Sequence, residues 1–81
     1  MLSEADFSHL RRAIHLAKTA REHGNHPFGA LLVATDGDVL AEAENSVVAA
    51  QDCTAHAELN LVRLVSGRYA TDTLAGSTLY S

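Results

Sequence analysis

A histidine and a glutamate two positions apart, His56 and Glu58, are the residues of this chain whose types and spacing best suit chemistry. A neutral imidazole is a common ligand of divalent metals, and a carboxylate beside a metal can accept a proton from a water molecule that the metal holds. Without further context, such a pair is more often the partly solvated first turn of a helix. The elements around the pair therefore decide whether it belongs to a site.

The first of these elements is a helix, which we predict over residues 3–23. Ser3 can cap its start together with Asp6, and Gly24 can adopt the left-handed conformation that closes a helix. The apolar residues of the segment recur at spacings of three and four, and they are Phe7, Leu10, Ala13, Ile14, Ala17 and Ala20. This period is typical of a one-sided helix, and we expect that side to pack on a sheet.

A β-hairpin follows the helix. Residues 28–34 form a short apolar run, which is typical of a strand buried on both faces. Asp36 and Gly37 form the dipeptide that favours a tight hairpin turn, and the partly alternating segment Val39–Glu44 suits the second strand. We therefore predict two antiparallel strands before the His56 region.

The second half of the chain contains a helix between two loops and then a strand. Residues 45–54 are predicted as a loop, although Val47–Ala50 could pack locally, and residues 56–65 are apolar on more than one side, as in a buried helix. Residues 68–76 are predicted as another loop, and residues 77–81 have strand character. Because that strand has no turn or cap after it, we interpret the chain as an incomplete domain.

Composition limits the class of protein. The chain has 81 residues, enough for one domain with a marginal core, and its net charge is −4. The basic residues are scattered, so a large nucleic-acid partner is disfavoured and a small neutral molecule is expected. The acidic N-terminus does not resemble a signal peptide and no apolar run could span a membrane. Together with the single cysteine, Cys53, this predicts a cytoplasmic protein.

Several short motifs occur in an order that resembles one known superfamily. They are Pro27-Phe28-Gly29-Ala30 opening a strand, Asp36-Gly37 at a hairpin, Asn45 after the second strand, Thr54-Ala55-His56-Ala57-Glu58 opening a helix, and Thr78-Leu79-Tyr80 in a third strand. The chain resembles the cytidine deaminase-like superfamily of zinc deaminases, and within it the bacterial guanine deaminases and related nucleoside deaminases. The H-x-E motif is the first half of the signature of these enzymes, and the second half, P-C-x-x-C, does not occur in the sequence.

The resemblance implies a fold and a metal site. The fold would be the N-terminal part of a three-layer α/β/α structure, consisting of helix, β-hairpin, helix and strand, with residues 1–81 as a single incomplete deaminase domain. One Zn²⁺ ion would be bound by His56 and by two cysteines of a later segment, and Glu58 would be the catalytic proton carrier. Cys53 departs from the pattern because it lies where many relatives have proline, and it does not replace the missing pair.

The resemblance also implies three contacts with substrate. Asn45 would hydrogen-bond the substrate, Phe28 would pack on its ring, and the main-chain N–H of Ala57 would contact an exocyclic group. Asn45 could equally be a turn residue, and a phenylalanine at a strand start is more often part of the core. His23 and His26 straddle a helix end, so we do not expect them to bind metal.

The implied activity is hydrolytic deamination of a nucleobase or nucleoside, with release of ammonia. A guanine-like purine is the first choice, and tRNA adenosine or cytosine and cytidine are alternatives within the class. The alternative from another class is a non-catalytic binding or assembly module that keeps half of the fold. We expect the chain alone to be inactive, because two zinc ligands are missing, and the complete form to be a homo-oligomer without membrane association.

Overall fold

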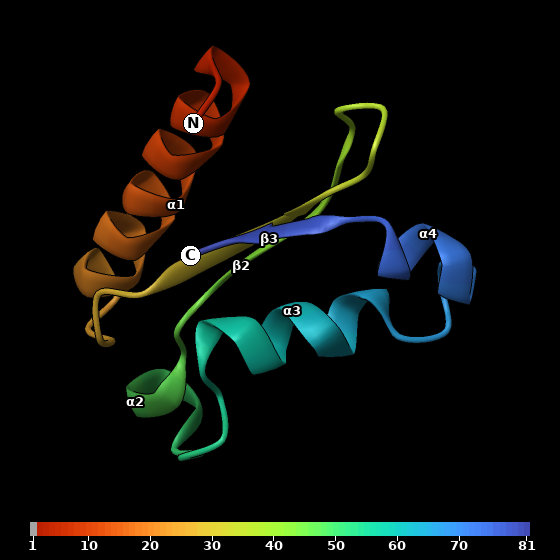
Figure 1. Cartoon of the computed structure of the whole chain (residues 1–81). Helices are drawn as coiled ribbons and strands as arrows, with labels where there is room; N and C mark the ends of the chain where they lie inside the picture. Colours follow the sequence, from red (N-terminus) through yellow and green to blue (C-terminus); the bar gives the residue numbers. More distant parts are fainter. Residues whose placement is uncertain (1) are drawn as a thin grey trace.

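The computed structural model describes residues 2–81 and places seven helices and strands among them (Figure 1). In chain order the elements are α1 (Glu4–Glu22), β1 (Gly29–Val33), β2 (Val39–Glu44), α2 (Val47–Ala50), α3 (Ala57–Val65), α4 (Thr71–Ala75) and β3 (Thr78–Tyr80). The predicted order of helix, hairpin, helix and strand is therefore confirmed. The short helices α2 and α4 lie inside the two segments predicted as loops.

The strands form a sheet in the order β2-β1-β3, and both pairs of neighbours are antiparallel. At the hairpin turn Gly37 has a φ of +94°, a conformation that glycine adopts without a steric penalty. The Asp38 N–H donates to the Asp36 carboxylate at 3.0 Å and closes the turn. The Asp-Gly signal was thus a correct guide to the hairpin.

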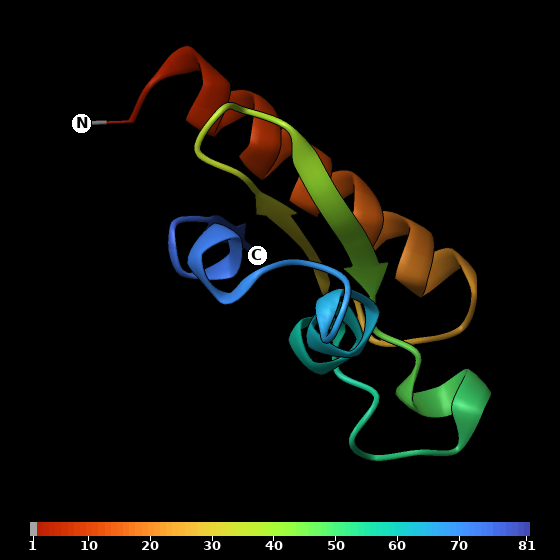
Figure 2. The same ribbon diagram turned by 90° about the vertical axis from the view of Figure 1, so that its right-hand side faces the viewer.

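The sheet is covered by α1 on one face and by α3 on the other (Figure 2). Successive residues of β1 point to opposite faces, which separates the buried residues into two clusters. Ala13, Leu31 and Val33 form the cluster under α1, and Ala30, Ala57 and Leu61 form the cluster under α3. This arrangement confirms the α/β/α layers and the prediction of a first strand buried on both faces.

Gly29 is where α1 comes nearest to the sheet. A Cβ atom added to it would lie 2.5 Å from the Cβ of Leu16, 2.7 Å from the Ala13 carbonyl oxygen and 2.8 Å from the Ala17 nitrogen. Two of these neighbours are main-chain atoms, which cannot move aside without displacing the helix. The absence of a side chain at Gly29 therefore allows α1 to pack directly on the start of β1.

The start of α1 is capped and tied to the third strand. Ser3 and Asp6 exchange the two hydrogen bonds of a capping box, as predicted, at 2.9 and 3.1 Å. The Tyr80 hydroxyl also donates to the Asp6 carboxylate, and this bond is the main cause that lowers the pKa of Asp6 and raises the pKa of Tyr80. At the other end, Gly24 has the predicted left-handed φ, at +85°.

The inward side of α1 differs from the prediction. Ala13 and Ala20 are buried, whereas Ile14 is 69% exposed and Phe7 is 49% exposed. The contact with Gly29 brings small residues of the helix against the sheet, and Leu16 also packs on the core, whereas Phe7 and Ile14 face outward. The period of the apolar residues was predicted correctly, but the buried side is narrower than expected.

The loop predictions for residues 45–54 and 68–76 were wrong in part. A helix of four residues, as in α2, is too short to show a period in its sequence, and side chains from outside it hold it in place. The Val47 N–H donates to the Asn45 Oδ1 at 3.0 Å, and the Ala49 N–H donates to the Asn25 Oδ1 at 2.8 Å.

In the part of the chain that the structure describes, no helix combines the length and apolar character needed to cross a bilayer.

Candidate functional site

The start of α3 presents the predicted metal ligand and the predicted proton carrier. His56 is the N-cap residue, with an extended backbone (φ −68°, ψ 152°), and its side chain makes no capping hydrogen bond. Glu58 lies in the first turn of the helix, where a negative charge is stabilised by the helix dipole. Both side chains are exposed and free to meet a ligand. Ala57 between them is fully buried in the described chain.

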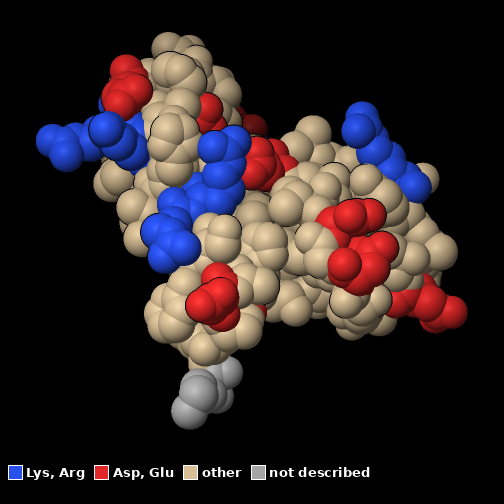
Figure 3. Space-filling view, turned by 90° about the horizontal axis from the view of Figure 1, so that it is seen from above, with Lys and Arg blue, Asp and Glu red and all other residues tan. Residues whose placement is uncertain are grey.

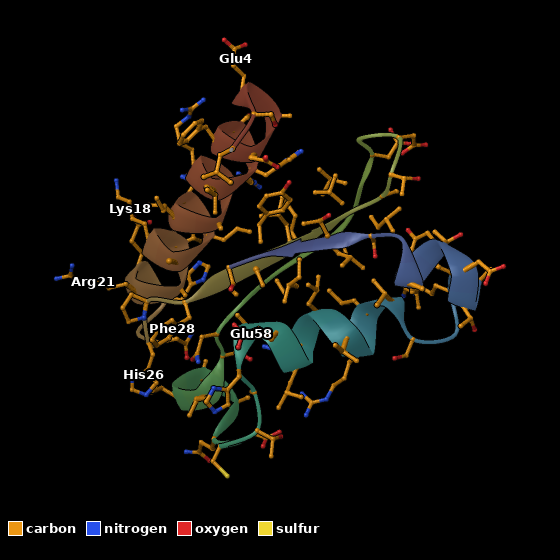
Figure 4. The ribbon with its side chains drawn as sticks, viewed as in Figure 1. Glu4, Lys18, Arg21, His26, Phe28 and Glu58 are labelled. Atoms are coloured by element: carbon orange, nitrogen blue, oxygen red, sulfur yellow. The ribbon has the colours of Figure 1, made fainter. Side chains whose placement is uncertain are left out.

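Glu58 and Phe28 line the same groove, a cavity of about 660 Å³. The rest of its lining comes from α1, from the start of β1 and from the last residue, and consists of Leu10, Ala13, Ile14, Ala17, Pro27, Gly29 and Ser81. Phe28 and Glu58 lie at the same end of the sheet (Figure 4). Phe28 is 59% exposed, so the interpretation of its ring as a core residue is wrong. A flat apolar wall beside a carboxylate is an arrangement that suits a planar ring with polar groups.

A main-chain hydrogen bond joins Asn45 to Phe28. Its N–H donates to the Phe28 carbonyl oxygen at 2.9 Å, and its side chain is only 2% exposed. The Oδ1 atom accepts from the Val47 N–H, so the turn role that the sequence allowed is present.

The described residues do not complete a metal site. They contain no group of three or more His, Cys, Asp and Glu side chains that could hold an ion together. His56 does not line the groove with Glu58, and Cys53 is exposed in the loop before it. The free imidazole at a helix start beside an acidic residue fits one part of a zinc site, and a catalytic zinc needs three protein ligands.

His23 and His26, the two histidines near the end of α1, lie in different surroundings. The His23 Nδ1 lies 3.1 Å from the Glu44 carboxylate, across the interface between α1 and β2. His26 is exposed in the segment before β1. Among the described residues, neither histidine belongs to a group of three or more His, Cys, Asp and Glu side chains that could hold a metal ion.

Neither Asn60 nor Arg63 was singled out from the sequence. In the structure the Arg63 guanidinium donates to the Asn60 Oδ1 at 3.1 Å and to the Thr54 hydroxyl at 2.9 Å. The available signal was a polar residue, Asn60, between two leucines of a mainly apolar helix. Such residues are usually hydrogen-bonded when they are removed from solvent.

The layered fold and the His-x-Glu pair at the start of the helix that follows the hairpin define a class, the zinc deaminases of the cytidine deaminase-like superfamily. The family model described as the cytidine and deoxycytidylate deaminase zinc-binding region matches residues 3–81. The chain belongs to this family.

Relatives with three different substrates are similar to this chain. A probable cytosine deaminase of Schizosaccharomyces pombe is 42% identical over 65 residues, which are 80% of this chain and 40% of the relative. A tRNA-specific adenosine deaminase of Aquifex aeolicus is 39% identical over 71 residues, or 88% of this chain and 46% of the relative. The X-ray structure of guanine deaminase from Bacillus subtilis superposes with a TM-score of 0.75 at 32% identity, over 98% of this chain and 49% of that one. The chain thus spans less than half the length of these relatives.

Proposed function

We propose that the protein containing this chain is a zinc-dependent aminohydrolase that removes an amino group from a nucleobase or nucleoside. The observation that carries the proposal is the shared groove of Phe28 and Glu58, with His56 at the start of the same helix as Glu58. The reaction adds water to a ring carbon, forms a carbonyl group there and releases ammonia. The family to which the chain belongs supports this reaction.

His56 is the residue of this chain that would hold zinc, through a neutral imidazole, together with two thiolates from a Pro-Cys-x-x-Cys segment elsewhere. When bound, zinc activates a water molecule as a nucleophile at neutral pH. Glu58 would carry one proton of that water to the ring nitrogen and then the proton of the added hydroxyl group to the departing amine. Its place in the first turn of α3 puts the carboxylate at the end of the helix where the helix dipole favours a negative charge.

Phe28, Asn45 and Ala57 would bind the base. The exposed Phe28 ring offers an apolar face, the Asn45 Nδ2 offers a donor, and the main-chain N–H of Ala57 would contact an exocyclic group. Guanine is the proposed substrate, and adenosine in tRNA is the second candidate because a tRNA-specific relative is similarly close in sequence. On the face shown in Figure 3, basic side chains are separated by acidic and uncharged ones, which favours the small substrate.

The experiment compares the 81-residue chain with a version extended through any coding sequence that follows Ser81. Zinc content would be measured in both, and ammonia release would be followed with guanine, cytosine and an adenosine-containing tRNA stem-loop. We expect no activity from the chain alone and one zinc ion with ammonia release from the extended protein. Inactivity and absence of zinc in both would favour the non-catalytic binding or assembly module.

Two properties of the complete protein are part of the proposal. We expect it to be a homo-oligomer, because homo-oligomers are common among the proteins that this chain resembles. We also expect it in the cytoplasm, where Cys53 and the two proposed zinc-binding thiolates would not be oxidised to disulfides. Size measurement in solution and cell fractionation test these two expectations.

A further inference from the structure

Asn60 makes an unusual set of contacts for a residue on a mainly apolar helix. Its side-chain Nδ2 lies 2.9 Å from the Glu44 carbonyl oxygen, 3.0 Å from the Ser46 hydroxyl and 3.3 Å from the Ala55 carbonyl oxygen. These groups come from the last residue of β2, from the N-cap residue of α2, and from the residue before the N-cap of α3. One amide group therefore contacts both ends of the segment between the sheet and the helix.

The contacts lie next to the two residues whose separation matters in the proposed site. Glu44 and Ser46 flank Asn45 in the sequence, and Ala55 directly precedes His56. The Ser46 N–H also donates to the Ala55 carbonyl oxygen at 3.0 Å, so the two ends of the segment are joined there. Any change in the position of the Asn60 amide would be transmitted to Asn45 and His56 together.

The orientation of that amide is fixed from its other side. Arg63 has only donors, so its contact of 3.1 Å requires the oxygen of the Asn60 amide to face it and the nitrogen to face the segment. Arg63 is held in turn by the Thr54 hydroxyl, which donates to the Asp52 carboxylate at 2.7 Å. The Thr54 N–H also donates to the Asp52 carboxylate, at 2.9 Å. The hydroxyl bond is the larger cause and the N–H bond the second cause that lower the pKa of Asp52.

We propose that Asn60 is a positioning residue that fixes the distance between Asn45 and His56, with Arg63 setting the orientation of its amide. Asn60 is not among the residues that line the groove, so it acts through its neighbours. Its catalytic consequence rests on the proposed deaminase function. We call the contacts of the Asn60 amide with Glu44, Ser46 and Ala55 the clamp. The clamp lies within the 81-residue chain, so it can be measured without an activity assay.

The clamp is tested by amide hydrogen exchange, followed by NMR on the chain itself. Asn60→Ala should speed exchange of the Ser46 and Val47 N–H groups about tenfold while the β1 and β2 amides keep their rates. Arg63→Met should give a smaller increase in the exchange rate of the same two amides. Because Arg63 is exposed, this variant can be tested even if Asn60→Ala does not fold. The matched control is Asn25→Ala, which removes a bond to the Ala49 N–H and should leave Ser46 unchanged.

An equal increase in exchange rate at every amide would show that Asn60 only stabilises the fold as a whole, and it would overturn the proposal. So would unchanged exchange at Ser46 in both Asn60→Ala and Arg63→Met. In the extended protein, Asn60→Ala should lower kcat about tenfold or more with zinc content unchanged. If the extended wild type is inactive, the proposed function fails, whereas the exchange data still decide whether the clamp exists.

Discussion

The Asn45 N–H donates to the Phe28 carbonyl oxygen at 2.9 Å, so these two residues extend the ladder of the β1-β2 hairpin by one step. Phe28 lies immediately before β1 and Asn45 immediately after β2. The side chains that we propose for substrate binding thus share one rigid support. A substitution that displaces the main chain of either residue is expected to weaken substrate binding by both.

Replacing Glu58 by glutamine should abolish proton transfer without removing the metal. The amide keeps the shape of the carboxylate but is not a base, so the rate of ammonia release from the extended protein should fall about 10²-fold to 10⁴-fold. The zinc content should stay the same. The control is Glu22→Gln, an exposed glutamate at the end of α1. Wild-type activity in Glu58→Gln would refute the role of this residue.

Replacing His56 by alanine should remove zinc from the extended protein. An imidazole is one of three required ligands, and its loss should lower metal occupancy and ammonia release together. Metal analysis after dialysis against a weak chelator measures the first, and an ammonia assay measures the second. His26→Ala is the matched control because that histidine is exposed and outside the proposed ligand set. Full zinc occupancy in His56→Ala would contradict the assignment.

Adding a methyl group at Gly29 should destabilise the chain. The new Cβ would lie 2.5 Å from the Leu16 Cβ and 2.7 Å from the Ala13 carbonyl oxygen, so α1 would have to move off the sheet. We expect Gly29→Ala to lower the free energy of unfolding by about 2 kcal/mol or more in denaturant titrations. Gly76→Ala is the control, since its nearest neighbour is the Thr35 methyl group at 3.2 Å. Equal stability of the two variants would disprove the close packing.

The ion pair between Arg12 and Glu42 predicts a dependence of stability on pH. The guanidinium donates to the carboxylate at 2.5 and 2.8 Å, and this hydrogen bonding lowers the pKa of Glu42 in the folded chain. A depressed folded pKa stabilises the protein above the unfolded pKa of about 4.3, and the stabilisation is lost as the pH falls through the folded pKa.

Glu42→Gln should therefore be less stable than wild type at neutral pH, and the difference should disappear in acid. Because both side chains are partly exposed, the difference should be small and should shrink further in about 1 M salt. Thermal unfolding at neutral pH and in acid measures it, with Glu22→Gln as a control that lacks a partner in the structure. A difference that persists unchanged in acid would exclude the ion pair as its cause.

The main elements could be predicted from the sequence because each has a local signal. The capping box at Ser3, the Asp-Gly turn at Gly37 and the apolar run that became β1 depend on neighbouring residues. Local signals do not show which residues far apart in the chain meet. The exposure of Ile14 depends on Gly29, and α2 depends on a hydrogen bond from Ala49 to Asn25.

The same limit applies to the candidate site. The resemblance placed His56 and Glu58 at the opening of a helix, and α3 begins there. The groove shared by Glu58 and Phe28 joins residues of separate elements, and no spacing along the chain indicates it. The role of Asn60 depends on contacts with Glu44 and Ala55, which are likewise visible only in three dimensions.

β1 has hydrogen-bonded neighbours along both edges and a packed helix over each face. A random mutational library should consequently show almost no accepted changes at Ala30 and Leu31, which are both fully buried there. The exposed positions around Cys53 should accept many. Under the proposed function, new substrate preferences would then arise most easily by changing the segment between β2 and α3, with the strand that follows Phe28 left unchanged.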